Sequence, residues 1–281
     1  MAGDNRRLSL AACTALVITM AAVPAVRAGA GVSCTFSSQT GILKVNMGPT
    51  TVATLKRDAA GTISVVNRSC TGPTPTVTNT KQIKVAGGDG TQSLSIDLGN
   101  GGFAPGSVKE IGTSAEIEFS ALLGGGTFDS VIILGSSGAD AIRLGIRGSG
   151  GSINVPAPRI NLNANESSGI DDDVIMLGVE KIVVAGNGGP DTVSGEGGAG
   201  TGEPIPVPLD LKGDGGADVL TGGTGGDILR GGSGGDTLKG GQGADDLIAE
   251  DGISANDSSS GGKGSDTCDS DAGDAETSCE N

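Results

Sequence analysis

A strict nine-residue period between Gly213 and Glu250 constrains this chain more than any other feature. The segment reads GDGGADVLT, GGTGGDILR, GGSGGDTLK and GGQGADDLIAE, so four units follow one another without a slip. Each unit has an aspartate at its sixth position and a leucine two residues later, and one core position departs, Asp214 in place of the second glycine. This pattern is typical of a parallel β-roll in which every unit forms a turn and a short strand.

The residue types of the turn suit a hard cation. Glycine permits positive φ and a tight turn whose carbonyl oxygens face inward. The aspartate that ends each turn supplies an anionic oxygen, and Ca²⁺ takes about six to eight oxygen ligands. The leucine points to the interior because side chains of a strand alternate between its faces. A flexible Gly/Asp-rich tract is the alternative, but the constant phase of both aspartate and leucine argues against it.

These repeats resemble the RTX (repeats-in-toxin) calcium-binding family. The resemblance implies that two repeats make one coil, that successive turns lie on opposite edges, and that ions sit between turns stacked on the same edge. Asp218 then pairs with Asp236, and Asp227 with Asp245. The predicted metal-binding residues are Asp218, Asp227, Asp236, Asp245, Gly222, Thr224, Gly231, Ser233, Gly240, Gln242 and Asp266.

Asp266 belongs to a later copy of the turn. Gly261 to Asp266 (GGKGSD) matches the turn in full, but Asp266 lies 21 residues after Asp245 and is therefore out of phase. The tract from Asp251 to Ser260 interrupts the period. We interpret this tract as a surface excursion after which the roll resumes, and the role of Asp266 stays open.

The chain divides into three parts. Residues 1–30 resemble a secretory signal peptide, with Arg6 and Arg7 before an apolar run and small residues; a retained anchor is the alternative. Residues 31–208 are β-rich, with short runs that alternate apolar and polar residues. Residues 209–281 form the predicted calcium-binding roll with an acidic tail.

The predicted fold class is all-β, a parallel β-roll preceded by a degenerate solenoid-like half. Residues 135–140 (GSSGAD) and 186–191 (GNGGPD) echo the repeat, whereas 202–208 (GEPIPVP) abandon it. We interpret residues 135–191 as degenerate repeats that lead into the intact repeats, with a proline-rich excursion between the two sets. A separate N-terminal β-sandwich is the alternative.

Four cysteines remain after residue 30, an even number in a chain expected to reach an oxidising space. Pairing by neighbourhood predicts disulfides Cys34–Cys70 and Cys268–Cys279, although four cysteines allow three connectivities.

Composition excludes several functions. The net charge is −15, and from Asp210 onward 16 acidic residues stand against 4 basic ones, so nucleic acid is excluded as a partner because phosphate binding needs the opposite sign. There is no histidine, which removes Ser-His-Asp and Cys-His catalysis. The acidic cluster Asp171–Asp173 could serve glycoside hydrolysis, but a turn or a solvated face explains it better.

The expected function is therefore calcium binding by a secreted, non-enzymatic protein that folds when calcium binds after export. No membrane span is expected in the mature chain. One alternative is an adhesin or surface-interaction protein, in which the roll is a calcium-stabilised spacer and residues 31–200 bind a partner. The other is an enzyme of unrecognised type in the N-terminal half.

Overall fold

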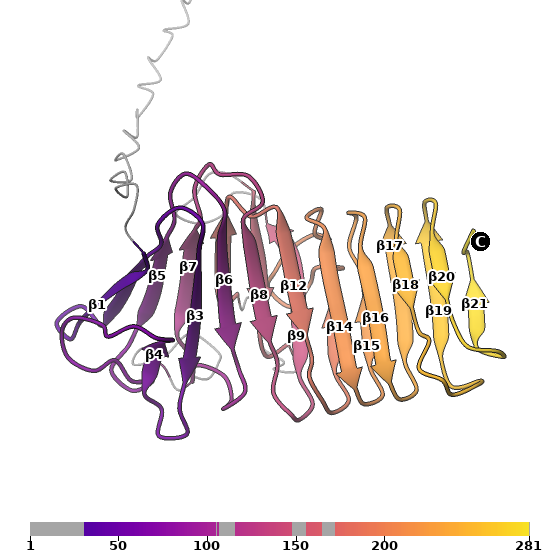
Figure 1. Ribbon diagram of the computed structural model, residues 1–281, viewed down its shortest axis with the longest axis horizontal. Coiled ribbons are helices and arrows are strands. Elements are labelled where there is room, and N and C mark those ends of the chain that lie inside the picture. The colour runs from indigo at the N-terminus through magenta and orange to yellow at the C-terminus, as the bar shows by residue number, and fades with distance from the viewer. Residues whose placement is uncertain (1–30, 105, 107–115, 148–155, 165–171, 281) are drawn as a thin grey trace, which may run out of the picture.

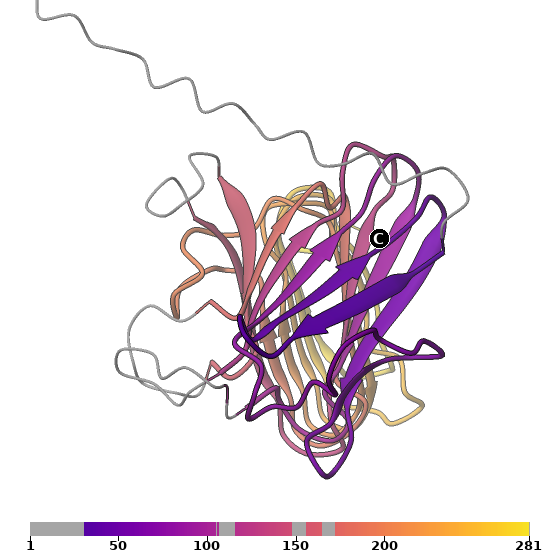
Figure 2. The ribbon, with the colours of Figure 1, turned by 90° about the vertical axis from the view of Figure 1, so that its left-hand side faces the viewer.

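The structure is a computed structural model that describes residues 31–104, 106, 116–147, 156–164 and 172–280. In these residues all regular structure is β, arranged as two long sheets that face each other along the molecule (Figures 1 and 2). The predicted signal peptide lies outside the described residues. Within the described ranges, no helix has the length and apolar character needed to cross a membrane.

The two sheets are called sheet A and sheet B. Sheet A contains, in spatial order, β1 (Ser33–Ser37), β2 (Ile42–Asn46), β5 (Gln82–Ala86), β7 (Glu118–Leu122), β11 (Val174–Leu177), β10 (Ala157–Asn161), β9 (Ala141–Arg147), β13 (Thr192–Ser194), β15 (Val219–Thr221), β17 (Thr237–Gln242), β19 (Ser258–Lys263) and β21 (Ala275–Thr277). Sheet B contains β20 (Thr267–Asp269), β18 (Asp246–Ile248), β16 (Ile228–Ser233), β14 (Leu209–Gly215), β12 (Lys181–Ala185), β8 (Ser130–Leu134), β6 (Gln92–Asp97), β3 (Thr51–Arg57) and β4 (Ile63–Val65).

The nonapeptide units alternate between the two sheets. Strand β15 pairs with β17 in parallel, with Leu220 opposite Leu238, and β16 pairs with β18, with Leu229 opposite Leu247. Partners are thus two repeats apart, which confirms that two repeats make one coil. The predicted all-β solenoid is confirmed.

The sheets run from the N-terminal half into the roll without a break. Strand β12 pairs with β14, and β13 pairs with β15, all in parallel, so both sheets cross residue 208. The alternative of a separate N-terminal sandwich is therefore wrong. Between β7 and β13, sheet A instead carries an inserted antiparallel meander of β9, β10 and β11.

A narrow core lies between the sheets. Each of the strands β15 to β18 contributes one fully buried leucine, whereas several strands of the N-terminal half contribute two aliphatic side chains, such as Leu43 and Val45 of β2 or Leu94 and Ile96 of β6. Phe36, Phe103 and Phe119 add aromatic bulk to the N-terminal half only. The N-terminal half thus gains more from apolar burial per strand than the roll does.

Both predicted disulfides form. Cys34 of β1 bonds to Cys70, and Cys268 of β20 bonds to Cys279. At the N-terminal end the outermost strands, β1 and β4, run antiparallel to their neighbours. Isolated bridges from Thr71 to Thr35 of β1 and from Thr76 to Thr62, next to β4, partly cover these edges, which limits pairing with another chain.

Two excursions change the length of a coil without breaking the sheets. Residues 195–208 leave the roll after β13, and Glu203 pairs there with Ile146 through two backbone hydrogen bonds of 2.8 and 2.9 Å. Residues 249–257 leave it after β18, and β19 then pairs with β17 as if the period had continued. The prediction that the roll resumes after an excursion is confirmed.

Candidate metal centre

The turns stack on two edges of the solenoid. Edge one holds the turns that lead from sheet B to sheet A, which are residues 135–140, 186–191, 213–218, 231–236, 249–257 and 270–274. Edge two holds turns that lead from sheet A to sheet B, among them residues 87–92, 123–129, 222–227, 240–245 and 261–266. We call two stacked turns of one edge a rung.

On edge one, each aspartate is joined to the aspartate of the next coil. The backbone N–H of one residue donates to carboxylate Oδ1 of the other, always in the same direction along the chain. The distances are 2.8 Å for Asp140 to Asp191, 2.7 Å for Asp191 to Asp218, 2.8 Å for Asp218 to Asp236, 2.7 Å for Asp236 to Asp257 and 3.2 Å for Asp257 to Asp274.

Edge two repeats the arrangement. The distances are 2.8 Å for Leu209 to Asp227, 2.9 Å for Asp227 to Asp245, 3.0 Å for Asp245 to Asp266 and, through Oε2, 2.9 Å for Asp266 to Glu280. The predicted stacking of Asp218 on Asp236 and of Asp227 on Asp245 is thus observed. We call each series of these hydrogen bonds a ladder. Asp266 joins the ladder of edge two although it is out of phase in the sequence.

The second carboxylate oxygen, Oδ2, of five ladder aspartates is buried and has no hydrogen-bond partner. This holds for Asp191, Asp218, Asp236, Asp245 and Asp257, and for Asp129 in the N-terminal half. The residues themselves are no more than 5% exposed. Because a buried anionic oxygen is costly unless a donor or a cation meets it, these oxygens fit a bound metal ion.

The first glycine of each turn leaves room beside that oxygen. A Cβ at Gly213 would lie 2.5 Å from the carbonyl oxygen of Gly231 and would also collide with Oδ2 of Asp218. On edge two a Cβ at Gly222 would collide with the carbonyl oxygen of Gly240 and with Oδ2 of Asp227, although this Oδ2 accepts a hydrogen bond of 2.6 Å from Gly223 N–H. A carboxylate oxygen and a carbonyl oxygen of the next coil therefore converge where only glycine fits.

The other predicted ligand residues are placed differently. Gly222, Gly231 and Gly240 are buried beside the carboxylates, whereas Ser233 and Gln242 lie exposed on the outer part of their turns. The carbonyl oxygen of Ser233 accepts a hydrogen bond of 2.8 Å from Gly216 N–H. The N–H of Thr224 donates to the carbonyl oxygen of Ile205 in the excursion, at 2.8 Å.

Metal ligands other than carboxylates must come mainly from the backbone. Among the described residues no group of three or more Asp, Glu or Cys side chains is placed to hold a metal ion. Two stacked aspartates per rung leave several positions around Ca²⁺ to be filled, and backbone carbonyl oxygens suit that cation.

Burial also changes the acidity of the ladder. Desolvation raises the pKa of Asp191, Asp227, Asp236 and Asp245 from 3.8 to about 6, against the lowering effect of their backbone hydrogen bonds. The pKa of Asp218 and of Asp257 is raised for the same first reason. Burial disfavours the charged form, so these carboxylates need a proton or a cation.

Sequence reasoning missed several ladder residues. Asp257 lies 21 residues after Asp236, just as Asp266 lies 21 after Asp245, so one shared insertion explains both. Asp191 was recognised only as part of an echo. Its separation of 27 residues from Asp218 spans a single coil, because the 195–208 excursion lengthens that coil.

The acidic cluster at residues 171–173 has structural partners. Asp172 forms ion pairs with Arg159 and, at 3.6 Å, with Arg147. Asp173 is 3% exposed and accepts a hydrogen bond of 2.5 Å from Leu162 N–H. Of the two structural interpretations, a turn or a solvated face, the solvated face is therefore wrong for Asp172 and Asp173. Asp171 lies outside the described residues.

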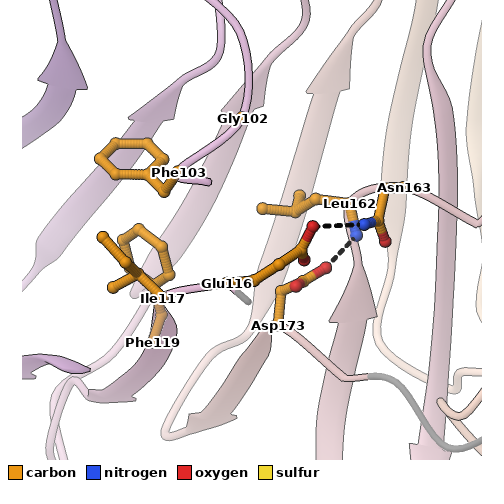
Figure 3. Close-up of a pocket in the computed structure, with 8 residues that line it drawn as sticks. All are labelled: Gly102, Phe103, Glu116, Ile117, Phe119, Leu162, Asn163 and Asp173. Carbon is orange, nitrogen blue, oxygen red and sulfur yellow. Dashed lines mark hydrogen bonds between the residues drawn. The ribbon is translucent and has the colours of Figure 1, made fainter. Parts of the chain in front are cut away.

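A cavity of about 40 Å³ lies beside Asp173 (Figure 3). Its wall includes Phe103 and Phe119, whose rings meet edge to face at 5.0 Å, and Glu116, which accepts a hydrogen bond of 2.7 Å from Asn163. Both carboxylates thus accept hydrogen bonds from the segment at residues 162–163.

The comparisons with known proteins bear on the roll. Residues 212–247 and 221–255 match the family model of the RTX calcium-binding nonapeptide repeat, in four copies. No curated protein and no solved structure matches the chain. Residues 212–255 are therefore an array of RTX calcium-binding repeats.

Proposed function

We propose that this protein is secreted, has no enzymatic activity, and completes its fold only when Ca²⁺ occupies the rungs of its repeats. The RTX repeats at residues 212–255 support calcium binding. The observation that carries the proposal is the set of buried carboxylate oxygens without partners, which belong to Asp191, Asp218, Asp236 and Asp257 on edge one and to Asp245 on edge two of the roll. Cations bound between successive stacked turns would satisfy these oxygens.

The ligands proposed for each rung come from two successive coils. On edge one, Asp218 and Asp236 supply carboxylate oxygens, and Gly231 and Ser233 supply backbone oxygens. On edge two, the carboxylates are those of Asp227, Asp245 and Asp266, and the backbone oxygens belong to Gly222, Thr224, Gly240 and Gln242. The ladder contacts of Asp191 and Asp257 extend the carboxylate set beyond the residues first predicted.

Calcium-driven folding follows from the balance of charge and entropy. Without an ion, buried carboxylates of adjacent coils repel one another, as the electrostatic effect of Asp245 on Asp227 indicates. Ordering a glycine-rich backbone adds a further entropic cost. An ion that binds only the ordered state adds about 2.7 kcal/mol per site when free calcium is a hundredfold above its dissociation constant.

Export is proposed on two grounds. Residues 1–30 have the composition of a signal peptide. The disulfides Cys34–Cys70 and Cys268–Cys279 suit an oxidising compartment, where such bonds persist.

The experiment is hydrogen exchange of the purified protein in calcium-free buffer and in millimolar calcium. Amides of residues 213–266 should exchange fast without the ion and slowly with it. Magnesium at the same concentration is the control, since Mg²⁺ demands a smaller octahedral site. Equal exchange in all three buffers would reject the proposal.

A further inference from the structure

A turn near the N-terminus has the same geometry as the turns of the roll. Residues 87–92 read GGDGTQ, with Gln92 five residues after Gly87, as Asp227 lies five after Gly222. Gly87 N–H donates to the carbonyl oxygen of Leu122 at 2.7 Å, as Gly222 N–H does to Lys239 at 2.8 Å.

The side-chain contacts of the two rungs correspond as well. Gln92 N–H donates to Oδ1 of Asp129 at 2.6 Å, as Asp227 N–H does to Oδ1 of Asp245 at 2.9 Å. A Cβ at Gly87 would collide with the carbonyl oxygen of Leu123 and the amide of Gln92. Turn 87–92 is therefore a repeat turn of edge two with glutamine in place of aspartate.

The amide of Gln92 is fully buried and faces a cluster of acceptors. With Nε2 turned to this cluster, its two N–H groups face three acceptors, the carbonyl oxygen of Leu123 at 2.6 Å, Oδ1 of Asp129 at 3.1 Å and the carbonyl oxygen of Gly88 at 3.2 Å. In the reverse orientation Oε1 would face these acceptors, and Nε2 would keep only contacts of 3.3 and 3.5 Å to Asp89 and Gly48. The hydrogen-bond network thus sets the orientation.

We propose that the amide group of Gln92 takes, in this rung, the position that a cation takes between stacked turns of the roll. Glutamine is one methylene longer than aspartate, so its amide reaches past the carboxylate position toward the oxygens of the next coil. There its N–H groups meet one carboxylate and two carbonyl oxygens, the ligand types of a calcium site. The comparison with an ion rests on the proposed calcium sites, but the closure of this rung by hydrogen bonds does not.

The consequence is that coils along the solenoid differ in whether they need calcium to fold. The Gln92 amide fills its place in this rung without a metal ion, although Oδ2 of Asp129 stays buried without a partner. The strands β5, β6 and β8 each bury two aliphatic side chains, and the Cys34–Cys70 disulfide lies in the segment before β5. We therefore expect the coils up to Gln92 to fold without calcium. They present formed sheet edges on which the calcium-dependent coils can pair.

The test uses hydrogen exchange of the full protein on peptides that cover residues 82–97 and 117–134. In the wild type these peptides should be protected equally with and without calcium. Gln92→Glu is nearly isosteric but places oxygen against oxygen, so protection should fall roughly tenfold or more without calcium and return in millimolar calcium. Gln92→Met, which has neither donor nor charge, should lose protection in both buffers.

The matched control is Gln39→Glu, the same change at an exposed turn residue of the same half, which should leave exchange unchanged. Fast exchange of the wild-type peptides without calcium would overturn the proposal. So would a Gln92→Glu protein that stays protected without calcium, or one whose protection calcium fails to restore. Exchange of residues 213–266 in the same samples reports on the calcium sites themselves, so failure of one proposal is distinguishable from failure of the other.

Discussion

The backbone N–H of Asp218 donates to Oδ1 of Asp236, one full coil further along the chain, at 2.8 Å. The other oxygen of Asp236 is left buried without a partner. One carboxylate therefore does two things, holding adjacent coils in register with one oxygen and offering the other to a cation.

The substitution Asp236→Asn separates these two roles. The asparagine side chain keeps a carbonyl oxygen for Asp218 N–H but puts an NH₂ group where the free oxygen was, so the rung should lose calcium while the coils stay in register. We expect calorimetric titration to show at least one ion fewer than in the wild type. Glu250→Gln, at an exposed residue just after the repeats, is the control and should bind the full number. An unchanged ion count for Asp236→Asn would exclude Asp236 as a ligand.

The roll should respond to pH in calcium-free buffer. Four ladder aspartates have their pKa raised from 3.8 to about 6 by burial. A raised folded-state pKa gives stability that is complete below the unfolded value and is lost as the pH rises through the folded one. Acidification from pH 7.5 to 4 without calcium should therefore increase the β signal in circular dichroism. A decrease over that interval would contradict the burial of these carboxylates in the folded state.

With calcium present the dependence should reverse. Protons and Ca²⁺ compete for the same carboxylates, because ligands must be deprotonated to bind metal. The apparent calcium affinity should weaken as the pH falls below about 6, the raised pKa of Asp236. Titrations at pH 7.5, 6 and 5 measure this, and equal affinity at all three would count against carboxylate ligation.

Asp214→Gly should stabilise the roll. Asp214 has a φ of 67°, in the region that favours glycine, and lies opposite Gly232 in the sheet. Its charge also raises the pKa of nearby Asp218 and Asp191, although burial is the larger cause. Relief of strain and of repulsion should add about 0.5–1 kcal/mol, measured by thermal unfolding.

Gly232→Ala, at the residue that faces Asp214 in the sheet, is the matched comparison for Asp214→Gly. Gly232 has a φ of 102°, and a Cβ there would collide with the carbonyl oxygen of Asp214. Gly232→Ala should therefore destabilise the roll. A gain in stability from Gly232→Ala, or a loss from Asp214→Gly, would refute the strain argument.

Leu238→Ala should weaken the narrow core of the roll. Leu238 is fully buried and is the one inward aliphatic side chain of β17. Truncation of a buried leucine costs about 2–5 kcal/mol, so the calcium concentration needed for folding should rise. Val219→Ala, at a residue that is 39% exposed in β15, should have a much smaller effect. Similar midpoints for both variants in a calcium titration would show that the leucine row is not the core.

The sequence predicted the parts of this protein that depend on short-range regularity. The turn chemistry of residues 213–250 and the inward leucines follow from spacing alone, because each unit needs only its own residues to form a turn and a strand. The pairing of Asp227 with Asp245 was implied by the resemblance to RTX repeats, in which two repeats make one coil, and the structure shows it. The two disulfides followed from nearness along the chain.

Only the tertiary structure decided where unequal coils meet. Asp191, Asp257 and Asp266 enter the ladder across separations of 27 and 21 residues, because parallel strand pairing restores the register after an excursion of any length. Gln92 lacks the carboxylate that defines the repeat, and its place in a rung depends on Asp129, which lies 37 residues away in the sequence and next to it in the structure. A sequence period reflects the local formation of turns. The position of a group between two turns depends instead on which coils are stacked, and stacking is set by contacts between residues far apart in the sequence.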